Sequence, residues 1–249
     1  MCRHIAYLGE PVRLAELLLN PEHSLLRQSW APRDMRGGGT VNADGFGIGW
    51  YTGTSAEPAL LRRAVPLWTD TALPRLASEV ASGGVLAAVR SATVGMPVVE
   101  TAAAPFARGP WLFSHNGVVR GWPSSMVPLA STLPVESLLT LDAPTDAALL
   151  WALLRHRLDA GDKPADAVAS LVAAVETAAP GSRLNLLLTD GQVIVGTAWT
   201  HALWVRRSPS GVAVASEPYD HDPSWREIPD RHLIVATESS VDITEIGQA

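Results

Sequence analysis

The sequence predicts an α+β fold with strands and helices in separate layers, and three features indicate this class. Short apolar runs typical of strands occur in the first and last thirds, two apolar helices lie between them, and strands and helices do not alternate regularly. Such a distribution favours layered α+β packing over repeated strand–helix–strand units. With 249 residues, 47% of them hydrophobic, the chain is expected to form a single domain spanning 1–249.

The N-terminal elements follow the chain terminus directly. Ile5–Leu8 is a short apolar run that predicts a strand, and this strand would fix the terminus inside a sheet. Leucines at helical spacing predict helix between residues 11 and 28, interrupted at Asn20-Pro21. Residues 30–40 are expected to form a loop.

Alternating glycines shape the next segment. Asp44–Trp50 contains three of them, which in a strand indicate a bulge or the close approach of another backbone, and Leu60–Arg63 is the expected hairpin partner. A helix is expected over residues 70–82, ended by Gly83-Gly84. Buried strands are expected over 85–90 and 111–117, and because each ends in polar residues, we expect the two strand ends to share a site.

The second half begins with the strongest helix signal. Thr145 and Asp146 open a helix with four leucines on one face and Gly161 beyond its end, and a second apolar helix is expected over 165–178. Short apolar runs then alternate with turns, at 184–188, 193–197, 203–206 and 212–215, and a last strand is expected over 233–236. This pattern predicts a meander of antiparallel strands.

Composition argues against several classes of function. A net charge of −6 without a basic block argues against a nucleic-acid partner. No apolar run approaches the ~18 residues that span a bilayer, and no secretory signal is present, so we expect no membrane association and a cytoplasmic location. The single cysteine and seven histidines lack the spacing of zinc sites, so no metal and no cofactor are expected.

Cys2 is the first candidate for chemistry. Removal of Met1, usual before a small residue, would leave a thiol and a free α-amine on one residue. The amine has an ordinary pKa of about 7.7–8.0 and the thiol one of about 8.5, so a neutral amine can take the thiol proton. One residue would then supply both nucleophile and base. The alternative is that a cysteine merely occupies position 2.

Further polar groups fit one substrate when they are taken with Cys2. The guanidinium of Arg90 can bind a carboxylate through two parallel hydrogen bonds, and a carboxylate at a helix start, such as Asp146, can bind an ammonium. The Asn116 amide and the Gly117 N–H suit an oxyanion, where loss of one donor costs ~2.7–4 kcal/mol. Singly, these groups could form an ion pair, a turn and a helix cap. Together they describe a γ-glutamyl group.

Over essentially its whole length the chain resembles the class II glutamine amidotransferases, whose nucleophile is an N-terminal cysteine. Four motifs in the family's order carry the resemblance: Met1-Cys2, Arg90-Ser-Ala-Thr93, Ser114-His-Asn-Gly117 and Pro144-Thr-Asp146-Ala. The resemblance implies a four-layer αββα sandwich of the N-terminal nucleophile hydrolase type, with Cys2 as the nucleophile.

The same resemblance implies how the substrate is held. Arg90 with Thr93 would bind the α-carboxylate of the γ-glutamyl group, and Asp146 would bind its α-ammonium. Asn116 with Gly117 would form the oxyanion hole. The nucleophile would carry a γ-glutamyl thioester, which water hydrolyses.

Further segments resemble the subgroup of this family that acts in ergothioneine biosynthesis. They are Met-Cys-Arg-His at the start, the glycine-rich segment 41–51, Arg62-Arg-Ala-Val-Pro66 and Ala215-Ser-Glu-Pro218. This resemblance implies hydrolysis of γ-glutamyl-hercynylcysteine S-oxide to glutamate and hercynylcysteine S-oxide, and no synthase domain that would receive ammonia is expected. The alternatives are a glutaminase subunit that passes ammonia to a separate synthase, and a non-catalytic binding domain.

The leaving group of that reaction carries a trimethylated amine, and quaternary ammonium groups favour aromatic faces. Four tryptophans are therefore candidates for its surroundings: Trp50, Trp68, Trp111 and Trp122. Arg3 is expected to contact the leaving group. His115 is expected to position the Asn116-Gly117 turn rather than to act as a base.

Overall fold

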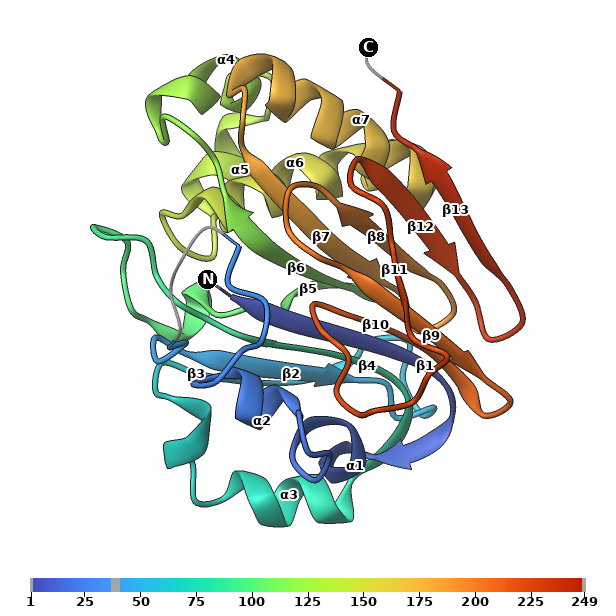
Figure 1. Cartoon of the computed structure of the whole chain (residues 1–249). Helices are drawn as coiled ribbons and strands as arrows, with labels where there is room; N and C mark the ends of the chain where they lie inside the picture. The colour runs from blue at the N-terminus through green and yellow to red at the C-terminus, as the bar shows by residue number, and fades with distance from the viewer. Residues whose placement is uncertain (1, 37–40, 248–249) are drawn as a thin grey trace.

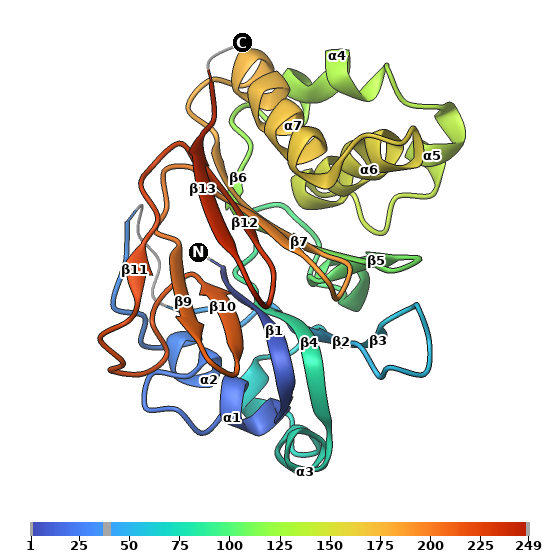
Figure 2. The same cartoon turned by 90° about the vertical axis from the view of Figure 1, so that its right-hand side faces the viewer.

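The structure is a computed structural model that describes residues 2–36 and 41–247 (Figure 1). Met1, whose removal the sequence analysis expects, and the last part of the expected loop over 30–40 lie outside the described residues. Within the described residues, two antiparallel sheets face one another, and helices cover their outer faces (Figure 2).

The first sheet holds the chain terminus near its centre. In the described ranges it has seven strands, in the spatial order β11 (Arg226–Glu227), β9 (Trp204–Ser208), β10 (Gly211–Ala215), β1 (Arg3–Arg13), β4 (Ala81–Val89), β2 (Phe46–Trp50) and β3 (Ala59–Arg63). Its outer face is covered by α1 (Leu14–Leu18), α2 (Leu25–Gln28) and α3 (Leu73–Glu79).

The second sheet has six strands among the described residues. Their spatial order is β13 (Val241–Glu245), β12 (His232–Ala236), β8 (Ile194–Ala198), β7 (Arg183–Thr189), β6 (Trp111–Val118) and β5 (Phe106–Arg108). The long helices α6 (Asp146–Asp159) and α7 (Pro164–Ala178) cover it, with α4 (Val127–Ala130) and α5 (Val135–Leu139) beside them. Short 3₁₀ turns lie at 67–69, 100–102 and 124–126.

The side chains of β1 show why the N-terminal run is continuously apolar. Successive residues of a strand point to opposite faces of a sheet. Ile5 and Tyr7 pack with the helices of the first sheet, whereas Ala6 and Leu8 pack between the two sheets. Both faces of β1 are therefore buried, and the predicted α+β class and four-layer αββα sandwich are confirmed.

The helix expected over 70–82 forms but is shorter at both ends, because α3 runs from Leu73 to Glu79 and Gly83-Gly84 lie inside β4. These glycines serve close packing rather than a helix end. A Cβ at Gly83 would lie 2.6 Å from the backbone oxygen of Gly9, and one at Gly84 would lie 2.8 Å from the Tyr51 ring.

The meander expected in the last third is also wrong. Its strands are divided between the sheets, with β7 and β8 in the second sheet and β9 and β10 in the first. Asn185 holds the crossing segment: its Oδ1 accepts hydrogen bonds from the N–H groups of Trp199 and His201, and its Nδ2 donates to the carbonyls of His201 and Ala202. Hairpin-like spacing in the sequence contains no signal for this crossing.

Asn116-Gly117 is not a turn. Both residues lie inside β6, where Asn116 pairs with Asn185 and Gly117 pairs with Leu184 of β7. No helix in the described part of the chain is long and apolar enough to cross a membrane.

Candidate active site

The sheet fixes the N-terminal end as the sequence predicts. Cys2 immediately precedes β1, which lies between β10 and β4, and the ladder with β4 begins where Arg3 pairs with Val89. The Cys2 Sγ lies 3.8 Å from the backbone oxygen of Ser91, just beyond the end of β4. The thiol is therefore held beside the segment that follows β4.

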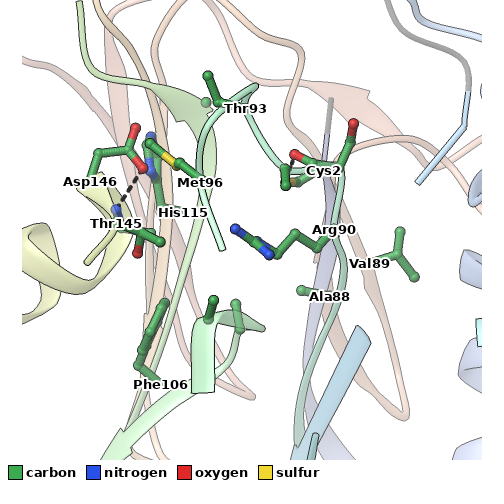
Figure 3. Close-up of a pocket in the computed structure, with 16 residues that line it drawn as sticks. Cys2, Ala88, Val89, Arg90, Thr93, Met96, Phe106, His115, Thr145 and Asp146 are labelled. Carbon is green, nitrogen blue, oxygen red and sulfur yellow. Dashed lines mark hydrogen bonds between the residues drawn. The ribbon is translucent and has the colours of Figure 1, made fainter. Parts of the chain in front are cut away.

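Cys2 lines a pocket between the two sheets that is open to solvent, and the pocket together with its mouth holds about 490 Å³ of empty space (Figure 3). Five of the predicted site residues line this pocket: Cys2, Arg90, Thr93, Gly117 and Asp146. They come from the chain terminus, from the segment after β4, from β6 and from the start of α6. The expectation that the ends of the strands over 85–90 and 111–117 share a site is thus confirmed.

Arg90 is a buried cation at this pocket, with 9% of its surface exposed. Its Nη1 donates to the backbone oxygen of Pro97 at 2.9 Å and to that of Asp44 at 3.5 Å. No carboxylate among the described residues forms an ion pair with it. Because a buried charge is costly without a partner, this guanidinium is suited to an anionic ligand.

Asp146 opens α6 as predicted and also faces the pocket. Thr145 is the N-cap, and its Oγ1 accepts from the Ala148 N–H at 3.2 Å. The Asp146 carboxylate accepts from the N–H groups of Val119 at 3.0 Å and Ala147 at 2.8 Å. These bonds and the helix N-terminus stabilise the negative charge. The carboxylate has further lone pairs with which to accept from a ligand cation.

Gly117 lets the backbone of β6 border the pocket. A Cβ at this position would lie 1.8 Å from the backbone oxygen of Arg183 and 2.6 Å from the Nε2 of His115. In the described residues, β6 pairs with β5 only as far as Phe113, so Gly117 has no strand partner on that side. His115 lies in the strand rather than in a turn, and its Nε2 is 2.9 Å from the Arg183 oxygen.

Asn116 lies on the other side of β6 and does not line the Cys2 pocket. It borders a smaller cavity with Arg3, Asp34, His201 and Ser216, among others. Its Nδ2 donates to the Ser216 Oγ at 3.3 Å, and its second N–H forms no hydrogen bond with a described residue.

Arg3 does not lie at the leaving-group side of the Cys2 pocket, contrary to the prediction from the sequence. Its side chain is 2% exposed, is absent from the pocket of Cys2, and forms an ion pair with Glu217 at 2.7 Å. Contact with a leaving group in that pocket is therefore not supported. The sequence holds no local signal for this pair, because Arg3 and Glu217 are 214 positions apart.

The four candidate tryptophans lie outside the Cys2 pocket itself. Among the described residues that line the Cys2 pocket, none is a tryptophan. Trp122 borders a neighbouring groove that shares Thr93 and Met96 with the pocket, and Trp68 packs edge-on against Trp30 at 5.6 Å.

Asp44 was not among the predicted site residues, and its carboxylate accepts a hydrogen bond from the Ala92 N–H at 2.8 Å. Two buried histidines were not predicted either: His4, two positions after Cys2, and His201, which borders the smaller cavity with Arg3 and Asn116. Burial, and then the charge of His115, lowers the pKa of His4 from 6.5 to about 3. Burial, and then the charge of Arg183, lowers the pKa of His201 from 6.5 to about 4. Both rings are therefore neutral at pH 7.

Residues 2–36 and 41–247 contain no group of three or more His, Cys, Asp or Glu side chains placed to hold a metal ion. The chemistry available at the pocket is that of a thiol, a guanidinium, a carboxylate and backbone N–H groups. This set is suited to acyl transfer at a small zwitterionic substrate.

Comparison with solved structures shows a matching fold. The chain superimposes on a glutamine aminotransferase class-II domain protein from Silicibacter pomeroyi with a TM-score of 0.71 and 25% identity, covering 99% of this chain and 100% of the other. It also matches the fold of the glutamine phosphoribosylpyrophosphate amidotransferase of B. subtilis, with a TM-score of 0.67 and 12% identity, over 50% of that chain.

Sequence comparison is more specific. The profile of the family described as "Glutamine amidotransferases class-II" matches residues 20–214. The chain is 42% identical to the γ-glutamyl-hercynylcysteine sulfoxide hydrolase of Mycolicibacterium smegmatis, covering 99% of this chain and 100% of the relative. It is 40% identical to the protein of the same name from Mycobacterium tuberculosis, covering 100% and 98%. The chain therefore belongs to the class II glutamine amidotransferase family, and it is an amidohydrolase.

Proposed function

We propose that the chain hydrolyses the γ-glutamyl amide bond of γ-glutamyl-hercynylcysteine S-oxide, a step of ergothioneine biosynthesis, and that Cys2 is the nucleophile. The products are glutamate and hercynylcysteine S-oxide. The names of the full-length relatives support this choice of substrate.

The observation that carries the proposal is that one pocket contains the Cys2 thiol, a cationic side chain and an anionic side chain. Arg90 is buried there without a carboxylate partner, and Asp146 presents a carboxylate from the start of α6. A γ-glutamyl group carries an α-carboxylate and an α-ammonium at one end and the scissile carbonyl at the other. Arg90 with Thr93 would bind the carboxylate and Asp146 the ammonium, which would direct the carbonyl to Cys2.

Acylation would begin on the mature terminus, after Met1 is removed. The Cys2 amine takes the thiol proton, and the sulfur bonds to the γ-carbonyl carbon. The resulting oxyanion accepts a hydrogen bond from the Gly117 N–H, which borders the Cys2 pocket, whereas the Asn116 side chain lies on the other side of β6. The protonated amine then donates to the leaving nitrogen as the carbon–nitrogen bond breaks.

Deacylation would regenerate the terminus. The amine accepts a proton from a water molecule, whose oxygen attacks the thioester carbon. The carbon–sulfur bond breaks, glutamate leaves, and the thiolate is protonated again. Every proton and electron pair is accounted for by Cys2, substrate and water.

The test is glutamate release by protein whose loss of Met1 has been established by intact mass. The sulfoxide conjugate and glutamine are offered separately, with Cys2→Ala as the control. We expect rapid release from the conjugate, little from glutamine and none with Cys2→Ala. Quenched wild-type reactions should carry one γ-glutamyl group on Cys2, removable by hydroxylamine.

The other outcomes separate the alternatives. Preference for glutamine would assign the chain to ammonia supply. Turnover that persists in Cys2→Ala would exclude the thioester, and the absence of turnover with either substrate would indicate a binding role.

A further inference from the structure

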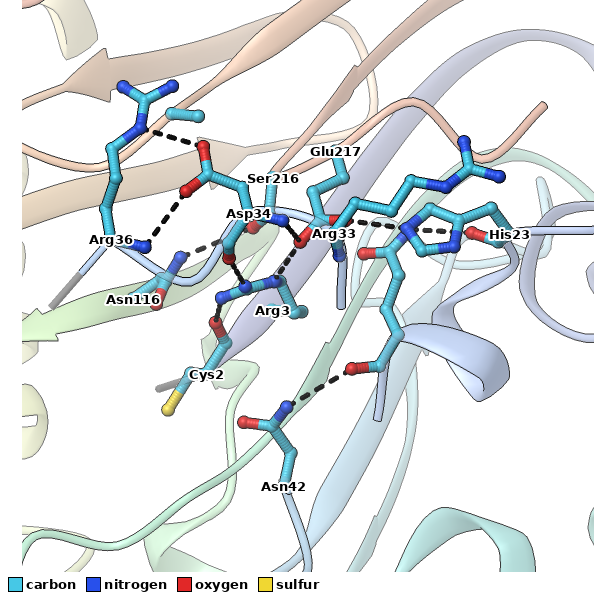
Figure 4. A network of polar contacts seen from close by, with 12 residues as sticks. Cys2, Arg3, His23, Arg33, Asp34, Arg36, Asn42, Asn116, Ser216 and Glu217 are labelled. Carbon is cyan, nitrogen blue, oxygen red and sulfur yellow. Dashed lines mark hydrogen bonds and ion pairs between the residues drawn. The ribbon is translucent and has the colours of Figure 1, made fainter. Parts of the chain in front are cut away.

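Arg3 and Glu217 form the centre of a buried polar network directly behind Cys2 (Figure 4). Arg3 is 2% exposed and Glu217 is also 2% exposed. Arg3 uses all three of its nitrogens: Nε donates to Glu217 Oε1 at 2.7 Å, Nη1 donates to the Cys2 backbone oxygen at 2.9 Å, and Nη2 donates to the Asp34 backbone oxygen. One guanidinium thus joins three chain segments.

Glu217 is held equally firmly. Its Oε2 lies 2.6 Å from the His23 Nε2 and accepts from the Arg33 N–H at 2.8 Å, while Oε1 also accepts from the Asp34 N–H at 3.2 Å. Burial raises the pKa of Glu217, but the hydrogen bond from His23 and the charge of Arg3 outweigh it, and the net pKa is lowered. The carboxylate is therefore ionised, and it orients the Arg3 guanidinium.

The position of Cys2 explains why such a clamp is needed. The ladder with β4 begins at Arg3, so the Cys2 carbonyl lies beyond the paired part of β1. On a chain end, no preceding residue restrains this peptide group. The Arg3 Nη1 supplies the hydrogen bond that a ladder partner would otherwise give, and so fixes the peptide plane and the Cα of Cys2.

We propose that Arg3, oriented by Glu217, is a positioning residue that holds the Cys2 peptide for nucleophilic attack. The proposal rests on the role of Cys2 proposed above. The proposal gives a structural role to the Met-Cys-Arg-His and Ala-Ser-Glu-Pro segments, because the ion pair between Arg3 and Glu217 joins them. Misplacement of a nucleophile by about 1 Å can reduce turnover about 100-fold, so a clamp on its backbone acts mainly on kcat.

The test compares Arg3→Ala with Arg75→Ala, an arginine on α3 whose side chain is 86% exposed. Intact mass establishes Met1 removal in each protein. We expect kcat of Arg3→Ala to fall about 10- to 100-fold with KM within about twofold of wild type. Iodoacetamide should alkylate Cys2 more slowly in this variant, and added guanidinium ion should restore part of the kcat. Arg75→Ala should match wild type.

A second variant is needed in case Arg3→Ala does not fold, because removing one partner of a buried ion pair leaves an uncompensated charge. The pair Arg3→Gln with Glu217→Gln removes both charges, and it should remain folded by circular dichroism while showing the same loss of kcat. The proposal is overturned if folded variants keep wild-type kcat and alkylation rate, or if the change is confined to KM, as expected of a leaving-group contact.

Alkylation separates this proposal from the proposed function, because it requires no substrate. Slower alkylation in Arg3→Ala, in a protein that releases no glutamate, would support the positioning role and reject the hydrolase function. Glutamate release by Arg3→Ala with unaltered alkylation and unaltered kcat would support the hydrolase function and reject the positioning role.

Discussion

The carboxylate of Asp44 accepts a hydrogen bond from the Ala92 N–H, with 2.8 Å between oxygen and nitrogen. The Asp44 N–H in turn donates to the Arg90 backbone oxygen at 3.0 Å. Asp44 therefore contacts the segment after β4 at both Arg90 and Ala92, and the residues just before β2 position the side of the pocket that Arg90 lines.

Asp44→Ala should weaken substrate binding because Arg90 loses this support. A hydrogen bond to a charged group is worth about 1.5–3 kcal/mol, so KM should rise about tenfold or more. Asp44→Asn keeps an acceptor and should show a smaller effect. Steady-state kinetics with the sulfoxide conjugate measure both, with the exposed Asp242→Ala as control. An unchanged KM in Asp44→Ala would contradict this arrangement.

Arg90→Gln should distinguish substrates by their α-carboxylate. The variant keeps a hydrogen-bond donor but loses the charge, so KM for a γ-glutamyl anilide should rise about 10- to 100-fold, the effect of losing about 1.5–3 kcal/mol. An analogue with its α-carboxylate converted to an amide should bind wild type and variant almost equally. Equal losses with both compounds would place the substrate carboxylate elsewhere.

Asp146→Asn should distinguish substrates by their α-ammonium. A γ-glutamyl anilide should lose affinity about tenfold or more, whereas a glutaryl anilide, which lacks the amine, should change little. The variant also places an NH₂ group near the N–H of Val119 or Ala147, so a lower melting temperature is expected. The ratio of kcat/KM for the two anilides is the measurement, and a ratio equal to that of wild type would contradict the assignment.

Gly117→Ala should damage both folding and catalysis. The added Cβ would lie 1.8 Å from the Arg183 backbone oxygen, so the backbone of β6 must shift. Overpacking typically costs about 1–3 kcal/mol of stability, and displacing an oxyanion donor costs ~2.7–4 kcal/mol in the transition state. Denaturant unfolding and kcat measure the two effects. Gly247→Ala is the matched control, since nothing lies within 4 Å of its Cβ, and wild-type kcat in Gly117→Ala would argue against the oxyanion role.

The buried histidines predict a loss of stability in mild acid. The pKa values of His4 and His201 are lowered from 6.5 to about 3 and about 4, so below pH 6.5 the unfolded chain binds protons that the folded chain does not. The free energy of unfolding should fall as pH decreases from 6.5, by on the order of 2 kcal/mol for each ring at pH 5. It should be insensitive to these rings above pH 7.5.

Urea unfolding between pH 5 and 7.5 checks this slope. Because the folded-state pKa of Glu217 is lowered, the stability that this carboxylate contributes is present above its ordinary pKa of 4.5 and is lost only as the pH falls below that value. The pH range of the histidine effect is therefore separate. His201→Phe should flatten the dependence, whereas the exposed His221→Gln should leave it as in wild type. A slope that is the same in all three proteins would contradict neutral burial of His201.

Local chemistry accounts for what the sequence predicted well. The helix starting at Asp146 was predictable because an N-cap, a carboxylate in the first turn and leucines on one face are properties of neighbouring residues. The strand after Cys2 and the convergence of Arg90 with Gly117 were predictable because apolar runs end in polar groups. The motif order then identified the family, which the comparisons confirm.

Glycine pairs are positions where neighbouring residues do not predict the local structure. Gly83-Gly84 has the composition of a helix end, and Asn116-Gly117 has that of a turn although it falls in the strand expected over 111–117; both pairs lie inside strands. The reason is steric: the atoms that exclude a side chain at Gly83 and Gly117 belong to Gly9 and Arg183, which are distant in sequence. A window of neighbouring residues does not contain them.

The sequence by itself determined the chemical groups of this protein, the class of its fold and most of its helices and strands, because these depend on side-chain type and short-range spacing. Only the tertiary structure decided that β9 and β10 cross to the first sheet, that Arg3 turns away from the Cys2 pocket, and that Glu217 receives it. Those outcomes depend on the partners available to a buried charge or an unpaired strand edge, and such partners are chosen by packing across the whole chain.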